Sequence, residues 1–149
     1  MKDDFISIIL DTAFRVLVPF TLIYGVYVLV FGEYGPGGGF QAGTALSVGV
    51  ILSKLIQGND KAEFNIRGTK AVILAGIGTF IYASVGFITL LFGGKFLEYE
   101  FLPLPYHSLT ELHLWGILGI EIGVTMCVMT TFIAIFSTLT GEEGPFKDA

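Results

Sequence analysis

The sequence predicts an all-α, polytopic membrane protein with four transmembrane helices. Of its 149 residues, 53% are hydrophobic and only 14% are charged, and the mean hydropathy is +0.77. A soluble domain of this size needs more polar side chains to cover its surface. Four apolar runs approach or exceed the roughly 20 helical residues that cross a hydrocarbon core of about 30 Å. They are too long for barrel strands, and open backbone is not tolerated in lipid, so helices are expected.

The four predicted spans are residues 8–31, 40–55, 70–92 and 112–139, within a single domain of residues 1–149. The second span is the shortest and the richest in small residues, so we expect it to pack inside the protein. The loop at residues 32–39 reads GEYGPGGG, a tight turn in which glycines supply unusual backbone angles. The segment 93–111 is longer and aromatic, which is typical of the membrane interface.

The basic residues predict the orientation. Seven of the eight Lys and Arg residues lie at the chain ends or around the loop between the second and third spans, and only Lys95 lies in the other two loops. The positive-inside rule assigns the basic side to the cytoplasm. Both termini should therefore be cytoplasmic, in a multi-pass membrane protein. Membrane lipid is an expected partner and nucleic acid is not.

Glu121 is the carboxylate placed deepest in a predicted span. It lies nine residues after Leu112, about 13 Å into the fourth helix at 1.5 Å per residue. An ionised carboxylate there costs a few kcal/mol (about 2.5–3.5 on insertion scales). Two interpretations are open: a structural glutamate hydrogen-bonded to a neighbouring subunit, or a carboxylate that takes part in proton or cation transport.

Gly119 and Gly123 form a G-x-x-x-G pattern around Glu121 and allow another helix to approach closely. They lie about 160° away from Glu121 around the helix axis, so the glutamate occupies a different face. In the second span, Gly39 and Gly43, then Ala45, Gly49 and Ser53, suggest a smooth packing face. Pro36, Gly37 and Gly38 precede it in a loop that should pass close beneath another helix.

Other polar residues are weaker candidates for ion translocation. Asp11 and Arg15 are four apart and can pair on the first helix, either as an interfacial pair or beside an aqueous path. His113 and Glu111 lie with His107 at the outer end of the fourth helix, where interfacial hydrogen bonding and proton relay are the alternatives. The spacing gives neither a zinc site nor a haem site, so no metal, cofactor or catalytic residue is expected in this chain.

Several remaining side chains have structural explanations. Lys54 and Lys70 are expected to reach from the helix ends to the cytoplasmic surface. Thr125, Thr130 and Thr131 should hydrogen-bond to their own helix. The single cysteine, Cys127, is expected to pack as a small apolar side chain.

Three motifs in order resemble the B subunit of Mrp-type multisubunit sodium/proton antiporters (the MnhB/MrpB family). They are PGGGF at residues 36–40, FGGKFL at residues 92–97 and IEIGV at residues 120–124. The family usually has aspartate where Glu121 stands, an apolar residue and glycine where Gln41 and Ala42 stand, and a tyrosine soon after the valine, where this chain has Thr125 and Met126. These departures are similar to versions of the protein in membrane-bound hydrogenases and sulfane-sulfur reductases.

The resemblance implies a small helical subunit that packs next to large antiporter-like subunits, with sodium ion and proton as the species that the complex transports. The chain would then be a non-catalytic ion-translocation subunit of an antiporter, hydrogenase or sulfur reductase complex, or a purely structural subunit of the same complex. A third hypothesis is an independent four-helix multidrug exporter. Those exporters are shorter and place their essential glutamate in the first helix, whereas this chain has it in the fourth.

Overall fold

The computed structural model describes residues 2–57, 66, 68–105 and 108–141, and the side chains of residue 8 and of residues 12–56 within the first of these ranges. These ranges contain four α-helices and no strand: α1 (Lys2–Phe31), α2 (Gly39–Gln57), α3 (Gly68–Leu91) and α4 (Leu109–Leu139). Two short 3₁₀ turns, η1 (Gly32–Tyr34) and η2 (Tyr99–Phe101), lie in the loops. Each α-helix contains a stretch long and apolar enough to cross a membrane. The predicted all-α class with four spans is confirmed.

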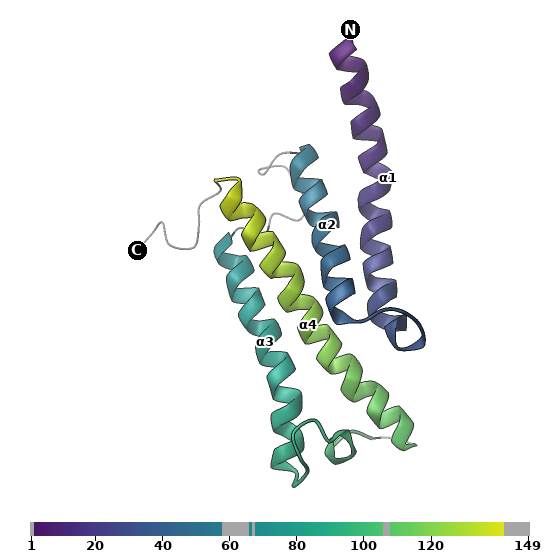
Figure 1. The fold of residues 1–149 in the computed structure, drawn as a ribbon, viewed down its shortest axis with the longest axis vertical. Helices are drawn as coiled ribbons and strands as arrows, with labels where there is room; N and C mark the ends of the chain where they lie inside the picture. Colours follow the sequence, from purple (N-terminus) through teal and green to yellow (C-terminus); the bar gives the residue numbers. More distant parts are fainter. Residues whose placement is uncertain (1, 58–65, 67, 106–107, 142–149) are drawn as a thin grey trace.

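The helices form a row rather than a closed bundle. The principal contacts join α1 to α2, α2 to α4, and α4 to α3, so that α1 and α3 form the two edges (Figure 1). The start of α1, the end of α2, the start of α3 and the end of α4 lie at one end of the molecule, here called the terminal end. The loops at residues 32–38 and 92–105 lie at the opposite end. Which of these ends faces the cytoplasm remains a prediction from the basic residues.

Helix α2 is the most enclosed element, as its small residues predicted. Within the membrane-spanning part of each helix, 44% of α2 is buried, against 11% of α1 and 17% of α3. Its two sides contact different neighbours: Gly49 packs on Leu22 of α1, whereas Gly43 packs on Thr125 and Val128 of α4. The small residues of α2 therefore form two packing faces, not the single face that their spacing suggested.

A buried threonine organises the connection between α3 and α4. The Thr89 hydroxyl is fully buried and accepts the Leu97 backbone N–H at 3.1 Å, and its oxygen lies 2.9 Å from the Lys95 carbonyl oxygen. The Phe96 ring lies against the bare backbone of Gly86 in α3. Leu97 takes a left-handed conformation (φ 64°), which reverses the chain here. These contacts give the FGGKFL segment a structural role: it folds back and packs against the C-terminal end of α3.

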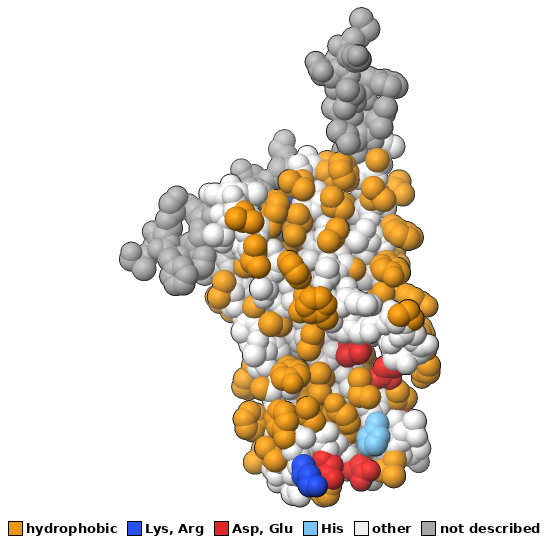
Figure 2. Space-filling model, in the orientation of Figure 1, with side chains coloured by type: hydrophobic (Ala, Val, Ile, Leu, Met, Phe, Trp, Pro, Cys, Tyr) orange, Lys and Arg blue, Asp and Glu red, His pale blue; other side chains and the backbone are white. Residues whose placement is uncertain are grey.

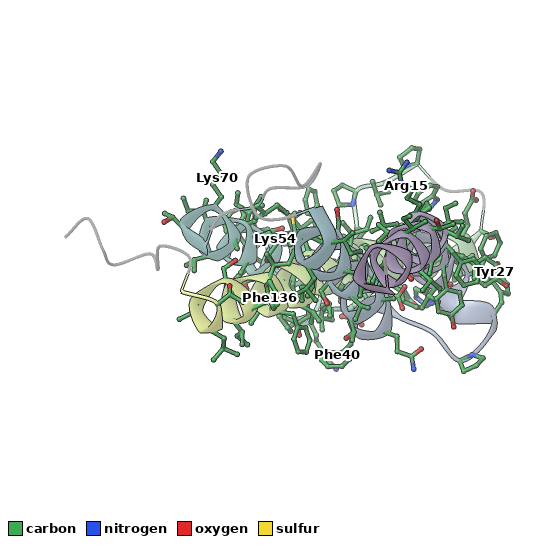
Figure 3. The ribbon with its side chains drawn as sticks, turned by 90° about the horizontal axis from the view of Figure 1, so that it is seen from above. Arg15, Tyr27, Phe40, Lys54, Lys70 and Phe136 are labelled. Atoms are coloured by element: carbon green, nitrogen blue, oxygen red, sulfur yellow. The ribbon has the colours of Figure 1, made fainter. Side chains whose placement is uncertain are left out.

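Lys54 lies in the protein interior at the terminal end. Its side chain is only 2% exposed, and Nζ donates hydrogen bonds to the Ile66 carbonyl oxygen at 3.0 Å and to Ser137 Oγ of α4 at 3.2 Å. Lys70, by contrast, is exposed and projects away from the helices, as the view along them shows (Figure 3). The expectation of a surface-reaching side chain is therefore wrong for Lys54, because Ser137 of α4 and the carbonyl of Ile66 bind its amino group in the interior. Val50, Ala71 and Ile133 form the apolar core beside it.

Candidate functional site

The PGGGF loop lies directly on the backbone of Glu121. A methyl group placed on Gly39 would lie 2.5 Å from the Glu121 carbonyl oxygen and 3.0 Å from its Cα, so only a residue without a side chain fits there. Gly38, which has a φ of 140°, faces the carboxylate itself: a methyl group there would lie 3.4 Å from Glu121 Oε1. The first turn of α2 and the middle of α4 therefore touch backbone to backbone, and the motifs PGGGF and IEIGV meet in space.

Thr125 joins the same two helices by a hydrogen bond. Its hydroxyl is 5% exposed and donates to the Gly39 carbonyl oxygen at 3.0 Å. The sequence predicted a bond to its own helix, which is what Thr130 and Thr131 make, with the carbonyl oxygens of Met126 and Cys127 respectively. Thr125 differs because the close approach at Gly39 brings a carbonyl of α2 within reach of its hydroxyl. This bond fixes the turn of α4 that follows Glu121.

The carboxylate of Glu121 lines a pocket between α4 and the end of α1. The pocket has a volume of about 300 Å³, and its wall combines three carboxylates with apolar and aromatic side chains: Val30, Glu33, Tyr34, Glu111, Leu114, Trp115, Leu118 and Glu121. Among the described residues, no Lys, Arg or His lines it. The acidic groups come from the turn after α1 (Glu33), from the start of α4 (Glu111) and from its interior (Glu121).

One oxygen of Glu121 has no partner among the described residues. Oε2 is buried from solvent and makes no hydrogen bond. A buried carboxylate oxygen without a partner is unfavourable, since it loses its hydration without compensation. The described residues therefore supply neither a hydrogen-bond donor nor a positive charge to this oxygen.

Gly123, on the other side of α4, contacts α3 rather than α2. A methyl group on it would lie 2.8 Å from both the Gly78 carbonyl oxygen and the Tyr82 backbone nitrogen. Gly119 is less crowded, with only Val85 at 3.4 Å. The helix geometry thus separates the glycine face from the Glu121 face, as expected from the angle between them. Within the G-x-x-x-G pattern, Gly123 makes the closer helix contact.

The structure places the other candidate residues at different positions. Glu111 lines the same pocket as Glu121, and Ser108 caps α4 by accepting the Glu111 backbone N–H with its Oγ at 3.3 Å. His113 instead lies 4.0 Å from Glu100 (Nε2 to Oε1) and edge-on to the Tyr99 ring. Burial, and secondarily Tyr82, raises the pKa of the Tyr99 hydroxyl.

Arg15 is exposed on α1, 15 residues before Val30 and so about 22 Å away along the helix from the pocket. His107 and the side chain of Asp11 lie outside the described residues. The predicted pairing of Asp11 with Arg15 and the predicted group of His107 with His113 therefore remain predictions.

The part of the chain that the structure describes contains no group of three His, Cys, Asp or Glu side chains arranged to hold a metal ion. Cys127 is partly buried on α4, with its sulfur 3.4 Å from Thr79 Oγ1 of α3. These positions favour a packing role for the cysteine.

Sequence reasoning missed Glu33, Trp115 and Leu118 as neighbours of Glu121. For the two α4 residues a signal was present, because positions 111, 115 and 118, and positions 114, 118 and 121, are three or four residues apart and share one face. Glu33 could be found only from the fold, since its position depends on how the end of α1 meets α4. The hydrogen bond of Thr125 likewise depends on the contact between α2 and α4.

The family model and the similar proteins all point to the B subunit of Na⁺/H⁺ antiporters. Residues 9–134 match the family model MnhB, described as a domain related to the MnhB subunit of Na⁺/H⁺ antiporter. A putative antiporter subunit mnhB2 of Staphylococcus haemolyticus is 28% identical over 144 residues, which cover 96% of this chain and 99% of that protein. The B subunit of the Na⁺/H⁺ antiporter of Bacillus subtilis is 28% identical over 92% of this chain and 95% of its own length. A putative mnhB2 of Staphylococcus aureus is 27% identical over 95% and 98%.

Proposed function

Because the chain belongs to the MnhB family, related to a subunit of Na⁺/H⁺ antiporters, we propose that it is a small integral membrane subunit of a multisubunit sodium/proton antiporter module and contributes to ion translocation through Glu121. The chain is not an enzyme by itself. Sodium ion and proton are the species transported by the complex, and the chain carries no cofactor. Its place is the prokaryotic plasma membrane, with the other antiporter subunits as partners.

The position of Glu121 is the observation that carries this proposal. The carboxylate lies in the interior of a membrane-spanning helix, and its Oε2 is buried without a hydrogen-bond partner among the described residues. Ionisable groups inside membranes are costly, and they mark ion or proton pathways in many transporters. Glu33 and Glu111 line the same pocket as Glu121, so the carboxylate has further acidic groups in its surroundings.

The host complex is the finer part of the proposal. We assign the chain to a respiratory complex of the membrane-bound hydrogenase or sulfane-sulfur reductase type, since its departures from the antiporter pattern are similar to those versions. Glu121, Gln41 and Thr125 are three such departures. Two of them lie at the site, since Thr125 bonds to the loop that covers Glu121. Purification of the complex with its copurifying subunits identified by mass spectrometry tests this assignment, and recovery of an antiporter without redox subunits would contradict it.

The second candidate function is a purely structural subunit of the same complex. The open row of helices favours it, because large apolar side chains along α1 and α3 are left uncovered, including Phe20, Ile23, Phe80 and Leu91. Such faces require lipid or neighbouring subunits. Under this alternative, Glu121 would be a hydrogen-bond partner at an interface between subunits and would carry no ion.

The substitution Glu121→Gln distinguishes the two functions, because it keeps the shape of the side chain and removes its charge. In vesicles that contain the assembled complex, we expect sodium-dependent proton transport to fall at least about tenfold, equivalent to about 1.4 kcal/mol in a barrier. Glu100→Gln, an exposed carboxylate outside the pocket, is the matched control and should leave transport unchanged. Unchanged transport in Glu121→Gln would refute the ion-path function, and loss of assembly would favour the structural one.

A further inference from the structure

The pocket at Glu121 is only partly enclosed by the described residues. It is open at the protein surface, at the depth of a membrane-spanning helix, and its wall contains apolar side chains such as Leu114 and Leu118 beside the carboxylates. Figure 2 shows acidic side chains surrounded by hydrophobic ones on one face of the molecule. An acidic opening of this kind is unfavourable against lipid, because hydrocarbon offers neither hydrogen bonds nor counter-charge.

The charge balance of the pocket indicates what covers it. Three carboxylates line it, whereas among the described residues no basic side chain does, and Oε2 of Glu121 is a buried acceptor to which none of them donates. A buried carboxylate in a medium of low dielectric is stabilised by a nearby positive charge. Arg and Lys side chains are donors only, so either satisfies an unpaired carboxylate oxygen and balances its charge in one contact.

A basic side chain of another subunit fits the pocket better than a bound metal cation does. The described residues offer no group of three metal-binding side chains. A hard cation requires about six oxygen ligands, whereas a guanidinium or ammonium group needs one or two acceptors. The pocket lies between α4 and the end of α1 and is only partly enclosed by the described residues. A helix that lies there can place a long side chain in its volume of about 300 Å³.

We propose that the Glu121 pocket is a docking site for a transmembrane helix of another subunit, and that this helix inserts a Lys or Arg side chain toward Glu121. The inference rests on the proposed function only in requiring a multisubunit complex. The partner's basic side chain supplies the donor that Glu121 Oε2 does not find among the described residues. Leu118 and Trp115, the latter 55% exposed, provide the apolar surface against which the partner helix packs.

Site-specific photo-crosslinking in the assembled complex tests the docking surface. A photoreactive phenylalanine analogue at position 118, inside the pocket, is compared with the same analogue at position 122, which is 43% exposed on α4 and outside the pocket. We expect position 118 to crosslink to a transmembrane segment of another subunit that has a Lys or Arg within one helical turn of the crosslinked residue. Position 122 should not give this product. Adducts with lipid only, with a second copy of this chain, or with a segment that has no basic residue would overturn the proposal.

Charge exchange then tests the predicted pair. Glu121→Lys should reduce the amount of assembled complex at least about tenfold, because two positive charges would face each other inside the membrane. Replacement of the partner's Lys or Arg beside the crosslinked position by Glu should restore assembly in the double variant. No rescue would contradict direct pairing. These two experiments measure association of the subunits, whereas the test of the ion path measures transport. Unchanged transport in Glu121→Gln would refute the ion path without affecting the crosslink or the rescue. The two proposals can therefore be refuted independently.

Discussion

Replacing Gly39 by alanine gives the sharpest test of how the PGGGF loop meets α4. The added methyl group would lie 2.5 Å from the Glu121 carbonyl oxygen. Backbone atoms cannot rotate away as a side chain can, so α2 has to move by about 0.5 Å for the contact to reach even the tight distance of 3.0 Å. The same movement would lengthen the Thr125–Gly39 hydrogen bond from 3.0 Å to about 3.5 Å, beyond the useful range.

The expected cost of Gly39→Ala follows from these two changes. Overpacking costs about 1–3 kcal/mol, and an interhelical hydrogen bond in a membrane protein contributes about 0.6–1.7 kcal/mol. The higher helix propensity of alanine offsets at most about 1 kcal/mol. We therefore expect the free energy of unfolding to fall by about 1–3 kcal/mol.

The measurement is a denaturant titration of the chain in detergent micelles, followed by the fluorescence of Trp115, the single tryptophan, which lines the neighbouring pocket. Gly35→Ala is the matched control, since it lies in the same loop, has extended backbone (φ −161°) and has no atom within 4 Å of an added methyl group. Its effect should stay within about 0.5 kcal/mol. Equal stability of the two variants would refute the backbone contact between Gly39 and Glu121.

The remaining predictions use the same kind of matched comparison. Gly123→Ala should destabilise the protein by about 1–3 kcal/mol, because the methyl group would meet the backbone of α3, while Gly119→Ala should be nearly neutral in the same titration. Lys54→Met should cost about 1–3 kcal/mol, since it leaves buried acceptors without their donor, and the exposed Lys70→Met should cost almost nothing; equal effects would contradict the buried position of Lys54. Folding raises the pKa of the Tyr99 hydroxyl. The contribution of Tyr99 to stability is therefore present below the ordinary tyrosine pKa of about 10 and is lost as the pH rises through the higher pKa of the folded protein. Thermal unfolding between pH 9 and 11 should show a smaller alkaline loss of stability for Tyr99→Phe than for the unmodified protein, and an identical loss would exclude this residue as its source.

Glu121 connects the conclusions about function. Its carboxylate is the common element of the proposed ion path and of the proposed contact with another subunit, and its backbone makes the close approach to Gly39. The glycine motif positions α2 so that Gly38 faces the carboxylate, and Thr125 holds the turn that follows it. A substitution in the loop can therefore alter Glu121 without touching it, and transport measurements on loop variants need stability controls such as Gly35→Ala.

The sequence by itself determined the four spans and the central place of α2, and it singled out Glu121 as the carboxylate within an apolar span. Each of these depends on local information: the length and hydropathy of a run, the size of its residues, or one charge within an apolar segment. The separation of Glu121 from Gly119 and Gly123 was also available, since it follows from the pitch of a single helix.

Only the tertiary structure decided which elements meet. The order α1–α2–α4–α3 brings the PGGGF loop onto Glu121, although about 80 residues separate them in the chain. It also turns the Thr125 hydroxyl to another helix and buries Lys54 against Ser137. A hydropathy pattern cannot contain this information, because it gives the polarity of each segment and says nothing of which backbone approaches which. In a membrane protein that choice depends on the shape of the contacting surfaces, where the absence of a side chain at Gly39 permits a contact that any other residue would block.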